Sequence, residues 1–264
     1  MANFFLPAKA DVLTQHTLAT PGSYTWICPV GVTQIEVEAW GGGGGGGGSG
    51  FGFSDGQHGG GGGGYFKATV TVVPSQSYTL NVGAKGIGGI GPNFGGDANI
   101  LSTAGGVSRI SDSVGAIISA GGGARGASTG RTGGVASINQ AGKVVTSTLI
   151  NGGNGGNHNT VLSQNVGAFL GGSRGVLEAS GNPVSGGGGA SFSANGGNGA
   201  NITGTGASEN TTAGGGGGGA GYLNGQRGLD KTVFVNRAIG GDGGDGRLIL
   251  RYTRTGGAVD NPPV

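Results

Sequence analysis

Eight consecutive glycines occupy residues 41–48, and a second block of six occupies residues 59–64. Glycine loses more conformational freedom on folding than any other residue, so such blocks make poor helices and poor strands. An ordered block must also find a partner for every backbone N–H and C=O group. In the extended three-fold conformation these groups point outward, and neighbouring segments can bond on all sides because no Cβ intervenes. The blocks therefore predict a bundle of polyglycine II helices.

Further glycine runs follow along the chain, separated by polar segments of variable length. They lie at residues 121–123, 152–156, 186–189, 196–199, 214–219 and 240–246. Uninterrupted glycine suits a helix that is buried on every side, whereas the interruptions Asn154, Asp242 and Asp245 suit a helix with one face in solvent. We assign a scaffold role to the glycines that bound the three longest uninterrupted runs. These are Gly41, Gly48, Gly59, Gly64, Gly214 and Gly219.

Two other kinds of glycine-rich chain fit the sequence less well. Collagen requires glycine at every third position and abundant proline, but here the glycines form blocks and the chain has 8 prolines. A flexible linker is the usual interpretation of glycine-rich sequence and stays open as an alternative. A linker joins domains that fold by themselves, however, and no segment outside the runs is large enough to do so.

Composition argues against several classes of protein. Glycine supplies 71 of the 264 residues, but charged residues make up only 10% and the net charge is +2, unlike a typical disordered chain. The chain has one cysteine, so no disulfide framework is expected. We expect no nucleic-acid partner because there is no Lys/Arg cluster to neutralise phosphates. No apolar stretch approaches 18 residues and no secretion signal is evident, so we expect synthesis in a cytoplasm without membrane insertion.

Alternating apolar residues predict strands at both ends of the chain. Residues 24–28 and 35–40 alternate on either side of a turn at Pro29, which predicts an antiparallel hairpin. Residues 66–72 and 78–82 predict a second hairpin around Pro74. Residues 247–253 predict one more strand, which needs a partner from the N-terminal hairpins. The expected fold class is mostly β and irregular, with short antiparallel strands, a polyglycine II bundle and little or no α-helix.

Several segments resemble the glycine-rich domains of phage tail-fibre and tail-tip proteins. Residues 24–40, YTWICPVGVTQIEVEAW, are similar to the opening of such domains. Three later segments are similar to their recurring middle and end: residues 81–86 (NVGAKG), 117–123 (IISAGGG) and 243–250 (GGDGRLIL). The alternation of glycine runs with variable segments also resembles the tip adhesins of T-even-type long tail fibres. This resemblance implies a polyglycine sandwich with receptor-reading loops, located at the tail-fibre tip of a virion. It implies two partners: a bacterial outer-membrane protein or surface glycan, and a tail-fibre shaft protein.

The resemblance covers most of the chain and suggests how the chain is organised. We expect residues 1–22 to form a short lead-in that is a candidate for fibre attachment. Residues 23–254 are expected to form a single glycine-rich adhesin domain, and residues 255–264 a C-terminal tail.

No pattern of catalytic or metal-binding residues stands out, so we expect no enzyme activity, no cofactor and no metal. The phosphate-loop motif is absent, and GxGxxG matches carry little weight in so glycine-rich a chain. Residues 240–245 are similar to a calcium-binding nonapeptide, but that motif works in tandem copies, so solvent-facing aspartates are the favoured interpretation. The three histidines, His16, His58 and His158, lie in unrelated segments and are expected to be surface residues.

The segments between the runs carry the candidate binding residues. Aromatic and arginine side chains dominate interface energetics when they anchor in a partner, although the same side chains could instead cap the ends of the bundle. The candidates are Phe51, Phe53, Asp55, His58, Tyr222, Arg227, Phe234 and Arg237.

Chain direction predicts where these candidates lie. If residues 41–48 lead away from the strands and residues 59–64 return, residues 49–58 lie at the remote end. If residues 214–219 lead away and residues 240–246 return, residues 220–239 lie there too. The turns at Pro29 and Pro74 and both termini then gather at the opposite end.

The predicted function is adhesion through variable loops on a rigid scaffold. Two alternatives stay open. A purely structural virion or fibre component would have the same scaffold but no receptor. An ice-binding glycine-helix protein should show glycine at every third position and a regular face of small residues, a pattern that the glycine blocks lack.

Overall fold

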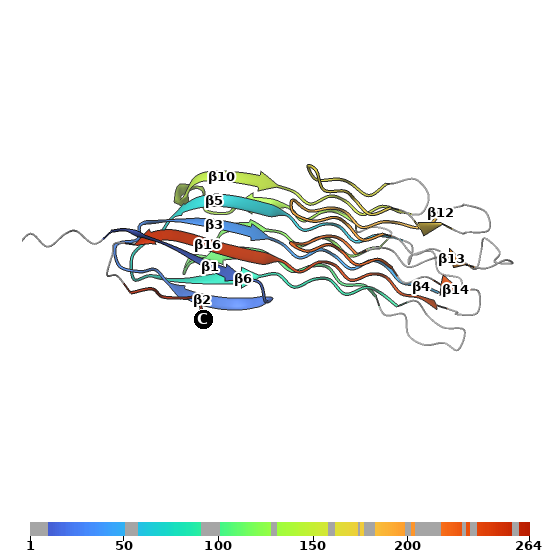
Figure 1. The fold of residues 1–264 in the computed structure, drawn as a ribbon, viewed down its shortest axis with the longest axis horizontal. Helices are drawn as coiled ribbons and strands as arrows, with labels where there is room; N and C mark the ends of the chain where they lie inside the picture. The colour runs from blue at the N-terminus through green and yellow to red at the C-terminus, as the bar shows by residue number, and fades with distance from the viewer. Residues whose placement is uncertain are drawn as a thin grey trace, which may run out of the picture.

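The computed structural model describes residues 10–50, 58–90, 101–127, 131–157, 162–173, 175–176, 183–198, 202–203, 218–228, 231–232, 237–254 and 259–264. These residues form two continuous parts, a β-sandwich and a bundle of extended glycine-rich runs that prolongs its strands (Figure 1). The only helical element among them is the 3₁₀ turn η2 (Ala141–Lys143). The expected mostly-β fold with little or no α-helix is therefore confirmed. No helix in this part of the chain is long and apolar enough to cross a membrane.

Two five-stranded antiparallel sheets form the sandwich. The first sheet has the order β1 (Val12–Leu18), β16 (Arg247–Arg254), β3 (Gln34–Trp40), β5 (Tyr65–Thr71) and β10 (Val144–Ile150). The second has the order β2 (Gly22–Ile27), β6 (Ser77–Val82), β7 (Ser108–Ser111), β8 (Ala116–Ala120) and β9 (Ala136–Ile138).

The hydrophobic core lies between the two sheets. Strand alternation places every second side chain of β3, β5 and β16 toward the second sheet, where these side chains are buried. Trp26 of β2 is fully buried, and its ring lies 5.7 Å from that of Tyr78 and 5.4 Å from that of Tyr252. Aromatic contacts thus join strands of both sheets.

The predicted hairpins are wrong in their pairing. The strands on either side of Pro29 are β2 and β3, which belong to different sheets, and the strands on either side of Pro74 are β5 and β6, which also do. Alternation shows which face of a strand is buried but not which strand lies beside it. The connections, residues 28–33 and 72–76, are longer than the two-residue turns that specify a hairpin, so they can cross between sheets.

The predicted strand at residues 247–253 does find an N-terminal partner. It forms β16, which pairs with β3 on one side and with β1 on the other. The lead-in therefore contributes β1 to the first sheet. The tail also packs on the sandwich, because the backbone N–H and C=O of Val264 both bond to Thr25 of β2.

Hydrogen bonds in the bundle recur with a period of three residues. Gly41, Gly44 and Gly47 all donate to the run 58–64, whereas the residues between them donate alternately to two other runs, 101–106 and 240–246. Carbonyl groups of the same segment accept from three further runs, 83–90, 121–127 and 218–220. Three-fold extended helices require this period, and polyglycine II conformation itself stays a prediction.

The described runs form a central group and a ring. Four central runs each bond to six others, and they are residues 41–47, 58–64, 186–190 and 218–220. Ten runs bond in sequence around them and close the ring. They are residues 83–90, 101–106, 121–127, 131–135, 151–157, 162–166, 169–173, 194–198, 223–228 and 240–246. The central positions belong to uninterrupted glycine runs, as predicted, although residues 214–217 lie outside the described part. The uninterrupted run 121–123 is an exception, because it lies in the ring.

Side-chain oxygens complete the hydrogen bonding around the ring. The carboxylates of Asp242 and Asp245 accept the backbone amides of Gly88 and Lys85 at 2.8 and 2.9 Å. In the same way the Asn154 amide oxygen accepts the Gly133 amide at 2.9 Å. A run at the perimeter lacks a neighbour on its outer side, so lateral acceptors of this kind satisfy amides that would otherwise rely on water.

A buried carboxylate fixes the β7–β8 turn against η2. The Asp112 side chain is buried and accepts hydrogen bonds from the backbone amides of Val114 at 2.9 Å and Gly115 at 3.1 Å. It also accepts from the Gln140 amide at 3.0 Å and pairs with the Lys143 ammonium. Burial alone would raise the pKa of this carboxyl, but these hydrogen bonds outweigh it and lower the pKa to about 2.

The close packing of the runs predicts that Gly44→Ala will be strongly destabilising. A Cβ at this central position would lie closer than 3.0 Å to the backbone of Ala124, separating hydrogen-bonded neighbours. Each backbone group left without a partner costs about 1–3 kcal/mol. We expect a large fall in melting temperature, measured by circular dichroism or calorimetry. The control is Gly142→Ala, where an added Cβ meets nothing within 4 Å. A Gly44→Ala protein that melts like the wild type would contradict the packing described.

The Asp112 cluster predicts a pH-dependent contribution to stability. Because the folded-state pKa of about 2 lies below the ordinary value of 3.8, the contribution is complete above the ordinary value and is lost as pH falls toward 2. Asp112→Asn should therefore lower the melting temperature at neutral pH, and its difference from the wild type should shrink between pH 4 and 2. The exposed Asp11→Asn serves as control. A difference for Asp112→Asn that stays constant across this interval would refute the assignment.

Candidate functional site

Short strand pairs lie at the end of the bundle that is remote from the sandwich (Figure 1). One pair joins β4 (Ser49–Gly50) to β15 (Arg237–Ala238), and a second joins β11 (Gly175–Val176) to β12 (Pro183–Ser185). A third pair, β13 (Ile202–Thr203) with β14 (Lys231–Thr232), is parallel. Chain segments far apart in sequence are thus brought together at this remote end.

The prediction from chain direction is confirmed for the first pair of runs. Gly41 bonds to Gly64 and Gly47 bonds to His58, so residues 41–47 lead away from β3 and residues 58–64 return to β5. Residues 240–246 likewise return to β16, since Gly46 bonds to Gly241 and Gly246 lies beside Trp40.

The prediction is wrong for residues 218–222, which lead toward the sandwich. Gly219 bonds to Gly44 and Tyr222 bonds to Asp245, nearer the sheets, after which the chain turns and residues 223–228 lead away. Two other segments turn similarly at residues 166–169 and 191–194. Three glycine-rich hairpins thus lie in the bundle without entering either sheet.

Several candidate binding residues fall outside the described part of the chain. They are Phe51, Phe53, Asp55 and Phe234, together with the scaffold residue Gly214. Their predicted roles therefore stay predictions.

The other remote-end candidates differ in exposure. His58 is buried, contrary to the expected surface position, and its Nδ1 lies 3.2 Å from Nη1 of Arg131. Arg227 is exposed on the perimeter run 223–228. Arg237 belongs to β15, where it pairs with Gly50 of β4.

Tyr222 lies between sandwich and bundle, not at the remote end. Its ring packs edge-on against Trp40 with the centroids 5.0 Å apart, and the guanidinium carbon of Arg247 lies 4.2 Å from its centroid. Phe192, at the tip of another hairpin, stacks on Tyr65 at 4.2 Å. We call these five residues the waist cluster.

The sequence analysis missed the structural role of the waist cluster. Trp40 and Tyr65 mark the points where β3 ends and β5 begins, next to the longest glycine runs. Phe192 and Tyr222 each lie a few residues after an uninterrupted run, within a short turn. An aromatic residue at the junction of a glycine run and a strand or turn is therefore the signal that could have revealed them.

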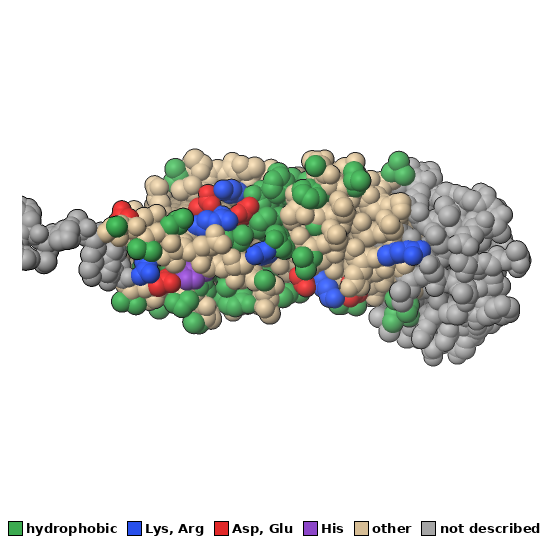
Figure 2. Space-filling model, in the orientation of Figure 1, with side chains coloured by type: hydrophobic (Ala, Val, Ile, Leu, Met, Phe, Trp, Pro, Cys, Tyr) green, Lys and Arg blue, Asp and Glu red, His purple; other side chains and the backbone are tan. Residues whose placement is uncertain are grey.

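Charged side chains gather on the outer face of the first sheet, over β16, β3 and β5 (Figure 2). Arg251 bonds to Glu36 at 2.7 Å and to Glu38 at 3.0 Å, and Lys67 pairs with Glu36 at 3.1 Å. Burial alone would raise the pKa of Glu36, but hydrogen bonds from Lys67 and Arg251 lower it. The two cations and two anions of this network compensate one another, so the network itself carries no excess charge.

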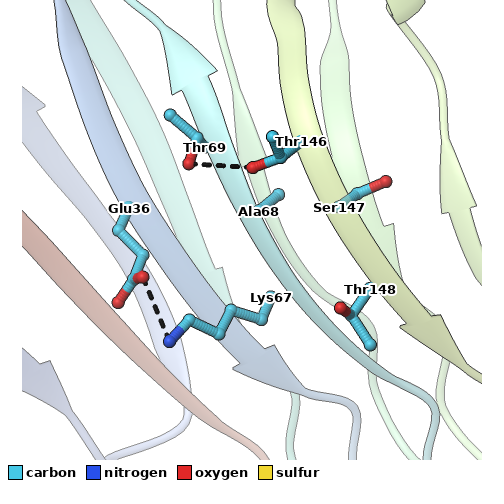
Figure 3. Close-up of a pocket in the computed structure, with 7 residues that line it drawn as sticks. All are labelled: Glu36, Lys67, Ala68, Thr69, Thr146, Ser147 and Thr148. Atoms are coloured by element: carbon cyan, nitrogen blue, oxygen red, sulfur yellow. Dashed lines mark hydrogen bonds and ion pairs between the residues drawn. The ribbon is translucent and has the colours of Figure 1, made fainter.

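A shallow groove borders this network between β5 and β10 (Figure 3). It is lined by Glu36, Lys67, Ala68, Thr69, Thr146, Ser147 and Thr148. Its volume of about 150 Å³ is below the roughly 300–1,000 Å³ typical of small-molecule sites. Geometry thus gives little support for a substrate pocket in this groove.

The described ranges contain no cluster of side chains that is typical of a metal site. No group of three His, Cys, Asp or Glu side chains there could hold an ion. At the calcium-like stretch, Asp242 accepts the Gly88 amide with one carboxylate oxygen and the Lys85 ammonium, at 2.9 Å, with the other. Asp242 and Asp245 thus both accept hydrogen bonds from the neighbouring run 83–90, whereas the sequence favoured side chains that face solvent.

Comparison with known proteins gives a family match over most of the chain. A family model described as "Glycine-rich domain" matches residues 17–253, from within β1 to within β16. The chain belongs to the glycine-rich domain family. The match therefore includes both the sandwich and the bundle of this glycine-rich domain. No curated protein matches the chain.

The waist cluster predicts that Tyr222→Ala will destabilise the glycine-rich domain by about 1–3 kcal/mol, since an aromatic contact and a cation–π contact are lost together. Tyr222→Phe keeps the ring and should melt close to the wild type. Thermal or urea unfolding measures both variants. Equal stability of Tyr222→Ala and Tyr222→Phe would show that the ring does not anchor this hairpin.

Proposed function

We propose that this glycine-rich domain is the tip adhesin of a phage tail fibre, which recognises a bacterial outer-membrane protein or surface glycan. The observation that carries the proposal is the convergence of segments at the remote end. The described residues that flank the segments 51–57, 204–217 and 233–236 lie at the end of a closely bonded bundle, away from the sandwich. Loops held by a rigid scaffold are well suited to recognition.

The scaffold suits such loops because the described bundle and sandwich each have their own stabilising contacts. Each central run bonds to six others along its length, and the sandwich contributes a separate hydrophobic core. A loop that joins two runs at the remote end can therefore differ in sequence and length without disturbing either part. Phe51, Phe53 and Asp55 stay the leading receptor candidates, with Phe234, Arg227 and Arg237 as further candidates. The burial of His58 against Arg131 favours a scaffold role for that residue. The waist position of Tyr222 favours a scaffold role for that residue.

The opposite end is suited to attachment. Its turns expose aliphatic side chains, with Val30, Val73 and Val114 exposed by 73%, 55% and 82%. Exposed apolar side chains of this kind give a protein partner surface that it can bury. We propose a tail-fibre shaft protein as the partner at this end, which directs the remote end toward the host cell.

A structural virion component with the same scaffold is the second candidate. It would use the same attachment end, but its loops would contact sister chains in place of a receptor. The ice-binding alternative has less support, because outward side chains of the perimeter run 83–90 include Ala84, Lys85 and Ile87, which differ in size and charge.

Cell binding by purified protein tests the proposal. Phe51→Ala combined with Phe53→Ala should abolish binding to host cells without changing the melting temperature. Val30→Ala combined with Val73→Ala, at the opposite end, is the matched control and should bind normally. A panel of bacterial strains that each lack one surface protein or glycan would then identify the receptor. Wild-type protein that incorporates into particles but binds no strain would favour the structural alternative, and normal binding by the Phe51/Phe53 variant would reject this loop as the contact.

A further inference from the structure

Strand β10 is an unprotected edge of the first sheet. Within the described part of the chain it pairs only with β5, and Figure 1 shows it at the margin of the sandwich. Five of its seven residues, 145–149, are exposed, so both faces of the strand meet solvent. Exposed edges present unpaired backbone groups and readily add another strand.

The C-terminal tail covers the edge strands β1 and β2, on the side of the sandwich opposite β10. Thr25 of the edge strand β2 exchanges two backbone hydrogen bonds with Val264, at 2.6 and 3.0 Å. The Asp260 carboxylate of the tail accepts the Tyr252 hydroxyl at 2.6 Å and lies 3.2 Å from His16 of β1. The tail therefore spans both sheets on that side, whereas β10 has no such cover among the described residues.

The sequence of β10 lacks the usual protection of an edge. Its residues, VVTSTLI, include no charge, no proline and no glycine. Lysine, proline and bulges are the devices that normally keep edges apart. A register shift against β5 does occur, but between Val144 and Thr146, at the start of the strand. Residues 146–150 keep a regular ladder with β5.

The same sequence is chemically symmetric about its middle residue. Around Ser147, Thr146 matches Thr148, Val145 matches Leu149, and Val144 matches Ile150. An antiparallel copy centred on Ser147 would therefore place threonine opposite threonine and aliphatic opposite aliphatic. Such cross-strand pairs stabilise sheets, and no like charges would oppose one another.

We propose that β10 is a self-association surface, through which two copies of this protein pair their first sheets around a two-fold axis at Ser147. The partner is a second copy because a two-fold interface requires a surface that complements itself, which this strand does. The pairing would join the two sheets into one and cover Val145 and Leu149, which are 54% and 40% exposed in the single chain.

The two-fold axis also determines the shape of the pair. Because paired strands are antiparallel, the two glycine bundles would extend in opposite directions from the joined sheets. The contact involves one short strand from each copy, so association should be weak and dependent on concentration. It does not rest on the proposed adhesin function, and either can fail without the other.

Sedimentation equilibrium over a wide concentration range tests the pairing. Wild-type protein should show a monomer–dimer equilibrium, and small-angle scattering should show a longer maximum dimension for the dimer. Ser147→Lys places two like charges at the axis and should weaken association at least about tenfold. Mixing Ser147→Lys with Ser147→Glu should restore it. Thr71→Lys, an exposed change on β5, is the matched control and should associate like the wild type.

A cross-linking experiment tests the position of the axis. Ser147→Cys should form a disulfide between copies on mild oxidation by a copper–phenanthroline catalyst, without any change to the charge of the strand. The natural Cys28 is buried and burial raises its pKa to about 11, so wild-type protein should form none. Wild-type protein that stays monomeric throughout, a dimer insensitive to Ser147→Lys, or Ser147→Cys that does not cross-link would each overturn the proposal.

Discussion

Backbone hydrogen bonding between glycine runs is the interaction on which the rest of the structure depends. A central run bonds to six neighbours, and an added Cβ at most of its described glycines would lie closer than 3.0 Å to a neighbouring backbone. Side chains are therefore excluded from the interior of the bundle, and no hydrophobic core can form there. The same constraint explains why the central runs are rich in uninterrupted glycine and why the interrupted runs lie on the perimeter, together with the short uninterrupted run 121–123.

The sandwich supplies the hydrophobic core that the glycine bundle lacks. Its buried side chains provide hydrophobic stabilisation, and its strands continue directly into runs: β3 leads into residues 41–47, and residues 58–64 lead into β5. A run that continues a paired strand has its hydrogen-bonding register fixed by that strand. The three inserted hairpins do not continue a strand of either sheet. Two of them instead carry an aromatic residue that packs on the sandwich: Phe192 on Tyr65, and Tyr222 on Trp40. The waist cluster thus aligns these hairpins with the sheets.

The sequence predicted local features well and long-range pairing poorly. Glycine purity predicted that the longest uninterrupted runs are central, because exclusion of Cβ is a property of each position, but it did not predict the perimeter place of the short run 121–123. Strand alternation predicted the buried faces, but it could not predict that β2 and β3 lie in different sheets. The path of residues 218–222 was predicted wrongly because the argument assumed that every run connects the sheets to the remote end. Phe51, Phe53 and Asp55 are outside the described residues, and their chemistry alone supports the receptor assignment.

Glycine bundles separate the requirements for stability from those for recognition. In a hydrophobic core a loop substitution can disturb packing through the side chains beneath it, but the described glycines of the central runs have no side chains to displace. Perimeter runs are constrained at glycines that approach a neighbouring backbone, such as Gly122 and Gly155. They are also constrained where a side-chain oxygen accepts a neighbouring amide, as in Asp242, Asp245 and Asn154. Outward side chains of a perimeter run, such as those of Ala84 and Ile87, meet neither constraint. Within the described part of the bundle, substitution is therefore least costly to stability at such outward positions.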